Sequence, residues 1–142
     1  MGSGSNRNPL GGFYTLEWAA ESTTIAGVKV LSNTNNKRSN DLPAYSNTSY
    51  MYFKRDSFGK ITQLRVYDKS HQAMLDIDIN QSKPHKNKDG SIIPAGMTHV
   101  HEWKTNSKGE LIRSKNARYL SNEEMKAYGD KIKQANNNAK FR

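Results

Sequence analysis

Two histidines stand one residue apart in the segment His99–Trp103 (HVHEW). Alternate residues of a strand point to the same side, so the two imidazoles would lie roughly 6 to 7 Å apart along it. Imidazoles exchange protons near neutral pH. One could therefore deprotonate a ribose 2′-hydroxyl while the other protonates the leaving oxygen, which is the chemistry of a ribonuclease that needs no metal.

Two further segments, Arg65–Asp68 (RVYD) and Leu75–Ile79 (LDIDI), alternate polar and apolar residues with the same period. If the three segments are neighbouring strands, one face of the sheet carries core residues, namely Leu64, Val66, Leu75, Ile77, Ile79 and Val100. The other face carries Arg65, Tyr67, Asp76, Asp78, His99, His101 and Trp103. We expect this second face to be the functional surface, open to a polyanion.

The polar face contains every group that the reaction needs. The imidazoles would act as acid and base, the arginine and the tyrosine would bind the phosphate, and one aspartate would orient a histidine. The predicted catalytic set is His99, His101, Arg65, Tyr67, Asp76 and Asp78.

A metal site is an open alternative, because two imidazoles beside Asp76 or Asp78 suit Zn, Mn or Fe. The spacing does not match a compact motif such as HExxH, so we predict neither a metal ligand nor a cofactor. A purely structural role is the other alternative. The aspartates would then pair with Arg65 in an ion network, Tyr67 and Trp103 would pack, and His71 and His85 would be loop residues.

Basic side chains outnumber acidic ones by 22 to 13, which gives a net charge of +9. Such an imbalance favours nucleic acid as a partner, ahead of an anionic membrane surface. We predict RNA rather than DNA, an immunity or host protein as a second partner, and no membrane partner. The predicted nucleic-acid-binding residues are Lys83, Lys86, Lys88, Trp103, Lys104, Lys37 and Arg38. Cysteine is absent, which excludes disulfides, thiolate metal sites and cysteine nucleophiles.

The elements that position these residues are mainly strands. Residues 49–56 and 60–68 form the best hairpin signal, joined by a turn at 57–60, and residues 72–79 would add a third antiparallel strand. Residues 26–32 and 98–104 are also strand-like, 111–120 resembles an edge strand, and 13–22 fits a helix or a strand equally. The segments 33–43 and 81–97 are long polar loops, a class that is often functional or disordered.

A helix should begin at Ser121, because Ser121 and Glu124 form a capping box. Met125, Tyr128 and Ile132 would give this helix an apolar stripe. We therefore predict an α+β domain with a central antiparallel sheet of about four to six strands, and with an N-terminal element and a C-terminal helix packed on one face. Residues 1–12 would be a flexible lead or a remnant of cloning, 13–135 the single domain, and 136–142 a polar tail.

The pattern R-x-Y, then LDID, then HxHxW resembles small domains at the C-termini of phage minor head proteins and of bacterial polymorphic toxins, over residues 63–103. The resemblance implies a phage or toxin protein in the bacterial cytoplasm, in a virion or delivered into a target cell. By analogy it implies a small nuclease of the barnase, EndoU, colicin and RelE type, which cleaves RNA without metal. A nucleic-acid binder without activity, a phage structural accessory, and an inhibitor of a host or defence enzyme are the alternatives.

Overall fold

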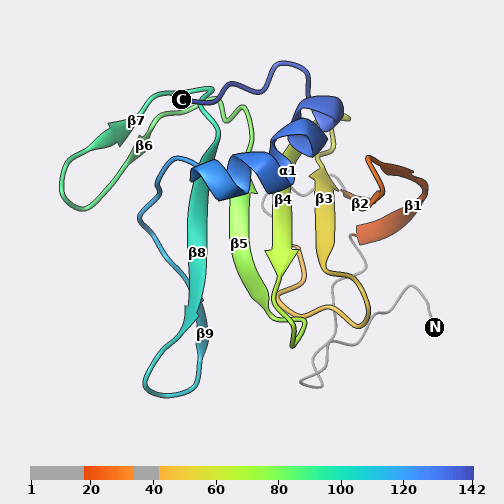
Figure 1. The fold of residues 1–142 in the computed structure, drawn as a ribbon, viewed down its shortest axis with the longest axis horizontal. Helices are drawn as coiled ribbons and strands as arrows, with labels where there is room; N and C mark the ends of the chain where they lie inside the picture. The colour runs from red at the N-terminus through yellow and green to blue at the C-terminus, as the bar shows by residue number, and fades with distance from the viewer. Residues whose placement is uncertain (1–17, 34–41) are drawn as a thin grey trace.

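The computed structural model describes residues 18–33 and 42–142, which form a seven-stranded sheet, a separate two-stranded hairpin and one helix (Figure 1). The strand order in the sheet is β1-β2-β3-β4-β5-β8-β9. The predicted α+β class is confirmed, with more strands than expected. The elements are β1 (Trp18–Ile25), β2 (Val28–Asn33), β3 (Met51–Arg55), β4 (Ile61–Tyr67), β5 (Ala73–Asp78), β6 (His85–Lys86), β7 (Ile92–Ile93), β8 (His99–Thr105), β9 (Leu111–Arg113) and α1 (Asn122–Ala135).

The centre of the sheet follows the predicted hairpins, since β3, β4, β5 and β8 pair antiparallel in that order. In the turn between β3 and β4 the Asp56 carboxylate accepts N–H bonds from Phe58 and Lys60, both at 2.9 Å. The described N-terminal residues form β1 and β2, and β2 pairs parallel with β3. The N-terminal element therefore extends the sheet. The segment 13–22 is a strand from residue 18 onward, and its first residues lie outside the described part.

The apolar face of the sheet is buried as predicted. All six core residues expected from the alternation are buried: Leu64, Val66, Leu75, Ile77, Ile79 and Val100. Helix α1 covers this face (Figure 1), with Ile132 fully buried and Tyr128 packed against the core. The predicted capping box is present, because Ser121 and Glu124 each accept the other's backbone N–H. This local pairing fixes where the helix begins.

The last seven residues, which we expected to be a polar tail, pack on the same layer. Ala139 is buried in the core cluster and Phe141 contacts it. The carbonyl of Lys140 accepts a hydrogen bond of 2.8 Å from the backbone N–H of Thr98. The C-terminus thus adds to the cover over the apolar face.

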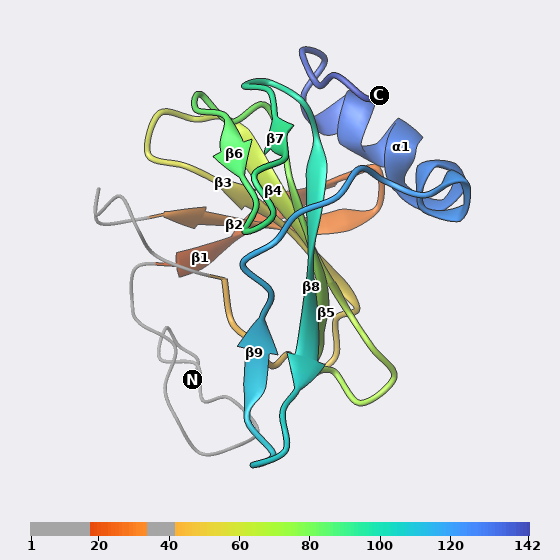
Figure 2. The same ribbon diagram turned by 90° about the vertical axis from the view of Figure 1, so that its left-hand side faces the viewer.

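The polar face of the sheet is also covered, so the prediction that it is open to a polyanion is wrong. Seen along the sheet, α1 lies on one side of β8 and the β6–β7 hairpin on the other (Figure 2). This hairpin is built from the long loop 81–97, and the segment 113–118 runs beside it after β9. The predicted loop 81–97 thus folds back over the sheet, and the predicted edge strand 111–120 is a strand only at Leu111–Arg113.

Candidate functional site

The ionisable residues of the polar face lie inside the protein. Arg65 and Asp76 are 1% and 0% exposed, and His99 and His101 are 4% and 2% exposed. Tyr67 is buried as well, and its hydroxyl donates to the Pro43 carbonyl. Buried charges persist only when they are paired and hydrogen-bonded. The arrangement of their partners therefore decides what these groups can do.

Arg65 and Asp76 form one half of a buried ion network. Arg65 donates to both carboxylate oxygens of Asp76, at 2.6 and 2.9 Å, and to the carbonyl of Leu42. Arg113 on β9 donates to Asp76 at 2.6 Å and to Asp78 at 3.0 Å. These arginine N–H groups are already committed inside the fold, so Arg65 is a structural residue. The predicted phosphate-binding role of Arg65 and Tyr67 is not supported by this geometry.

The other half of the network reaches the histidines. Strand register places Asp78 opposite His99 and Asp76 opposite His101 across β5 and β8. One oxygen of Asp78, Oδ2, lies 3.5 Å from Nε2 of His99 and 3.7 Å from Nε2 of His101. The predicted convergence of two imidazoles and a carboxylate is therefore present, although it lies beneath the surface.

A third imidazole joins them from the β6–β7 hairpin. The ring of His85 lies 5.6 Å from that of His99 and 4.9 Å from that of His101, measured between centroids, and the last two rings lie 5.3 Å apart. One nitrogen of each ring lies within 4.8 Å of one nitrogen of each of the others. We call His85, His99 and His101 the imidazole cluster. It joins residues that the sequence separates by a long loop.

The hairpin that carries His85 is fastened to the segment after β9. The side chain of Asn87 donates to the carbonyl of Ala117 at 2.9 Å and accepts from its N–H at 2.8 Å. The backbone N–H of Lys88 donates to Asn116 at 3.0 Å. The two chain segments are therefore held in register beside the sheet, which fixes the position of His85.

Each ring of the cluster also contacts one backbone carbonyl. Nδ1 of His99 lies 3.0 Å from the Met97 oxygen, and Nδ1 of His101 lies 2.8 Å from the Ser114 oxygen. Nε2 of His85 lies 2.9 Å from the oxygen of Lys115. The carbonyls of the adjacent residues Ser114 and Lys115 therefore hold two of the three rings, and the carbonyl of Met97, just before β8, holds the third.

The charges around the cluster shift its ionisation. For Asp78, burial raises the pKa, but His99, the Arg113 cation and Gln63 outweigh burial and hold the pKa well below its usual range. For His99, burial lowers the pKa. Asp78 and the Met97 carbonyl raise it by more than burial lowers it, so the net pKa is raised. Burial and the Arg113 cation lower the pKa of His101. The three groups thus share one strongly coupled electrostatic environment.

A pocket of about 250 Å³ opens beside the cluster. Asp78, His85 and His99 belong to its wall, and the loop before β6 supplies the rest, namely Gln81, Ser82, Lys83 and Pro84. The side chain of Asp78 retains 13% exposure. At this pocket His85 and His99 of the cluster border open space.

The predicted nucleic-acid-binding residues are divided by the structure. Lys83 lines the pocket, and Lys86 and Lys88 are exposed on the adjoining hairpin. The ring of Trp103 lies under the Arg65 guanidinium, 4.9 Å from centroid to carbon, so this indole packs inside the network. Lys37 and Arg38 lie outside the described residues.

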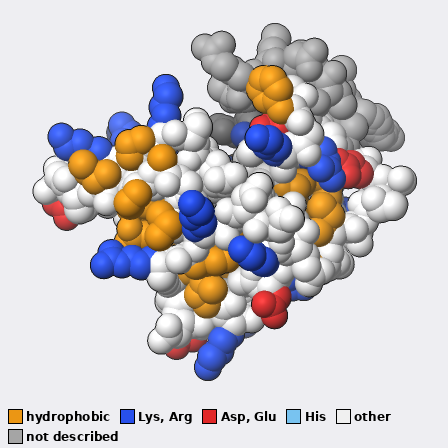
Figure 3. Space-filling model, turned by 90° about the horizontal axis from the view of Figure 1, so that it is seen from above, with side chains coloured by type: hydrophobic (Ala, Val, Ile, Leu, Met, Phe, Trp, Pro, Cys, Tyr) orange, Lys and Arg blue, Asp and Glu red, His pale blue; other side chains and the backbone are white. Residues whose placement is uncertain are grey.

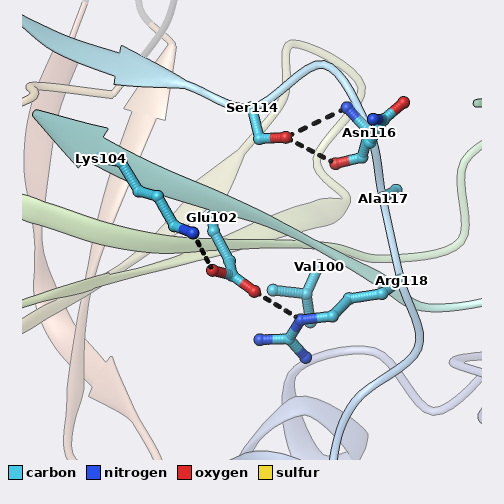
Figure 4. Close-up of a pocket in the computed structure, with 7 residues that line it drawn as sticks. All are labelled: Val100, Glu102, Lys104, Ser114, Asn116, Ala117 and Arg118. Atoms are coloured by element: carbon cyan, nitrogen blue, oxygen red, sulfur yellow. Dashed lines mark hydrogen bonds and ion pairs between the residues drawn. The ribbon is translucent and has the colours of Figure 1, made fainter. Parts of the chain in front are cut away.

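Lys104 lies at another pocket, of about 230 Å³, between β8 and residues 114–118 (Figure 4). Glu102 there contacts Lys104 at 3.7 Å and Arg118 at 2.8 Å (Figure 4). Strand alternation puts this pocket on the α1 side of β8, away from the cluster. Since its charges are paired with one another, we do not assign the functional site to it.

His85 and Arg113 were not in the predicted catalytic set, although both contribute to the site. The Asp89–Gly90 turn signal within the loop 81–97 could have shown a hairpin, and hence a strand that carries His85. Arg113 pairs in register with Trp103, which places it beside the polar face. This register could not be predicted, because β9 is only three residues long.

No protein-family model matches this chain. Searches of curated proteins and of solved structures likewise found no match. In the described part of the chain no helix has the length and apolar character needed to cross a membrane. The resemblance to phage and toxin domains therefore stays a prediction, and a functional assignment for this chain rests on its own site.

Proposed function

We propose that the protein cleaves phosphodiester bonds of RNA at the pocket beside the imidazole cluster. One observation carries the proposal: His85 and His99 belong to both the imidazole cluster and the pocket, and Asp78 and Lys83 lie in the same pocket wall. A phosphate in this pocket would lie beside a lysine ammonium and the imidazoles of His85 and His99.

The surrounding charge favours a polyanionic substrate. Lys83, Lys86 and Lys88 are all exposed, in the hairpin and the loop that leads into it. Lys and Arg side chains lie around the end of the molecule formed by this hairpin, together with hydrophobic and some acidic ones (Figure 3). Lysines that contact backbone phosphates bind without reading base sequence. The surface thus favours binding along a nucleic-acid strand.

RNA suits the site better than DNA because RNA carries its own nucleophile. The ribose 2′-oxygen attacks phosphorus, the 2′-oxygen–phosphorus bond forms and the phosphorus–O5′ bond breaks. The 2′-hydroxyl loses its proton to solvent and the leaving O5′ takes one up. The chain then has to bind the phosphate and to stabilise the negative charge that develops on its oxygens. Lys83 would provide this stabilisation, with His85 and His99 beside it in the pocket wall.

The proposal differs from an open acid–base pair on the sheet surface. The side chain of His101 is 3% exposed and that of His99 is 5% exposed, so a nucleotide cannot lie flat on both rings. Access is from the side, along the wall that His85 and His99 share. The proposed phosphate-binding residue is therefore Lys83, in place of Arg65 and Tyr67.

The test is electrophoresis of a single-stranded RNA, and of DNA with the same sequence, after incubation with the purified protein. RNA should be cut to products ending in 2′,3′-cyclic phosphate, and DNA should stay intact. Lys83→Ala should lower the rate by about a hundred- to a thousandfold, in the range of a lost charge-stabilising contact. Lys108→Ala is the matched control, because Lys108 lies in the turn at the far end of β8 (Figure 1).

Intact RNA in the presence and in the absence of added Zn²⁺ would exclude the proposed activity. So would equal cleavage by wild type, Lys83→Ala and His99→Asn. RNA binding without cleavage is the second candidate, favoured by the burial of His101 and by the exposed lysines of the hairpin. Its signature is a salt-sensitive complex that gives no product and that His99→Asn leaves unchanged.

A further inference from the structure

The imidazole cluster brings three basic nitrogens to one point inside the fold. One nitrogen of each ring of His85, His99 and His101 lies within 4.8 Å of its counterparts. His99 and His101 are buried and His85 is half-buried. Each buried ring nitrogen in this small volume needs a hydrogen-bond or metal partner, because buried polar atoms are seldom left unpaired.

The backbone carbonyls decide which nitrogen of each ring is free. A carbonyl oxygen can only accept, so the nitrogen facing it must carry the proton. The protonated nitrogens are Nδ1 of His99, Nδ1 of His101 and Nε2 of His85. The opposite nitrogen of each neutral ring then has a lone pair available. A metal-binding histidine is held in the same way, with its second N–H donated to a carbonyl or a carboxylate.

The distances to Asp78 favour a metal ion over shared protons. A charge-assisted N–H···O bond is about 2.7 to 2.9 Å long. The Asp78 oxygen lies 3.5 Å from Nε2 of His99 and 3.7 Å from Nε2 of His101, which is too far for such a bond. With metal–nitrogen bonds of about 2.0 to 2.1 Å, the three nitrogens would need to move inward by less than about 1 Å each. The cluster is thus spaced for an ion at its centre.

The donor set indicates the class of ion. Three imidazoles beside one carboxylate suit Zn²⁺ and neighbouring first-row ions, whereas Mg²⁺ and Ca²⁺ prefer oxygen ligands. We propose that His85, His99 and His101 bind one divalent transition metal ion of the zinc class, with the Asp78 carboxylate next to it. Arg113 donates to Asp78 at 3.0 Å and orients this carboxylate.

Such an ion has two consequences for the protein. It links the β6–β7 hairpin to β8, because His85 belongs to the hairpin and the other two ligands to the strand. It also lies beside the pocket, whose wall includes Asp78, His85 and His99. The inference deepens the proposed RNA cleavage by naming the positive charge beside the phosphate. Metal binding itself does not depend on that activity and is tested separately.

The experiment starts from full-length protein dialysed against a chelator and then freed of it. Zn²⁺ is titrated by calorimetry and the stoichiometry is read by native mass spectrometry, with Mg²⁺ as the control ion. Co²⁺ serves as a spectroscopic probe, since imidazole ligation changes its visible absorption. Wild type should bind one Zn²⁺ per chain, not bind Mg²⁺ at the cluster, and unfold at a higher temperature with Zn²⁺.

The deciding variant is His85→Asn, because His85 is half-buried on the hairpin and its loss should leave the sheet folded. Its Zn²⁺ affinity should fall at least about tenfold. His71→Asn is the matched control, since His71 is the fourth histidine and lies apart from the cluster, stacked on Tyr50. Far-UV circular dichroism checks the fold of both variants.

The metal site is overturned if wild type binds less than about half an equivalent of Zn²⁺ when the Zn²⁺ concentration is about ten times that of the protein. It is also overturned if His85→Asn binds as tightly as wild type, or if His71→Asn loses as much affinity. One Zn²⁺ per chain together with uncut RNA would support the metal site and exclude the proposed cleavage. RNA cut equally well with chelator present would exclude a catalytic role for the ion.

Discussion

Arg65 and Asp76 face each other across β4 and β5 and form a two-bond ion pair, 2.6 and 2.9 Å long, inside the protein. Their side chains are 2% and 0% exposed. A guanidinium and a carboxylate fit each other in this bidentate geometry. The pair lies on the polar face of the sheet. Asp76 is paired in register with His101, and the Arg65 guanidinium lies over the Trp103 ring.

Removing one partner of this pair should destabilise the protein strongly. Asp76→Asn leaves Arg65 buried without its counter-charge and should lower the free energy of unfolding by about 3 to 5 kcal/mol. Urea unfolding followed by circular dichroism measures the change. Asp130→Asn on the exposed side of α1 should change it by less than about 0.5 kcal/mol. A loss below about 1 kcal/mol in Asp76→Asn would show that the pair is not fully desolvated.

Asn87 should act as a positioning residue for His85. Asn87→Ala removes two hydrogen bonds to Ala117, of 2.9 and 2.8 Å, that hold the hairpin against the segment after β9. Each bond contributes about 1 kcal/mol, so Zn²⁺ affinity should fall by up to about thirtyfold while the stoichiometry stays the same. Calorimetric titration separates the two quantities. Exposed Asn137 supplies the control, and an unchanged affinity in Asn87→Ala would mean that the hairpin is positioned by other contacts.

The junction between β8 and α1 should weaken in acid. The hydrogen bonds from Arg118 lower the pKa of Glu124 below its ordinary value of 4.5. The ion pair between Arg118 and Glu124 therefore stabilises the protein fully above about pH 4.5. This contribution is lost as the pH falls through the folded-state pKa of Glu124. Because Arg118 is 40% exposed, the contribution should be about 1 kcal/mol or less.

Unfolding free energies at pH 7 and pH 3 would measure this effect. Arg118→Met should be less stable than wild type at pH 7, and the difference should shrink at pH 3. Lys126→Met, a change to an exposed cation of the same helix, should give no such dependence. A constant difference between wild type and Arg118→Met at both pH values would contradict the assignment.

RNA binding should depend on salt through the hairpin lysines. For single strands, each phosphate contact contributes about −0.7 to the slope of log affinity against log salt concentration. Lys86→Ala should therefore make the slope shallower by about 0.7, and Lys108→Ala should leave it unchanged. Fluorescence anisotropy with a labelled RNA across a salt series gives the slope. Equal slopes for both variants would place the binding surface away from the hairpin.

The sheet and its helix could largely be predicted from the sequence. All six residues that the alternation along the predicted strands assigned to the core are buried, because side-chain direction along a strand depends only on position. The capping residues Ser121 and Glu124 located the start of α1, because their hydrogen bonds are local. The convergence of Asp78 with His99 and His101 followed from the same alternation once the strands paired in register.

What covers the polar face could not be predicted, because alternation gives the direction of a side chain and not what packs above it. Arg113 reaches Asp76 from β9, 37 positions along the chain. His85 reaches the cluster only because Asn87 joins its hairpin to Ala117, 30 positions away. The sequence by itself determined the two faces, the core and the start of the helix, which depend on neighbouring residues. The tertiary structure alone decided that His99 and His101 are buried and that His85 joins them in one cluster, because both depend on contacts between distant segments.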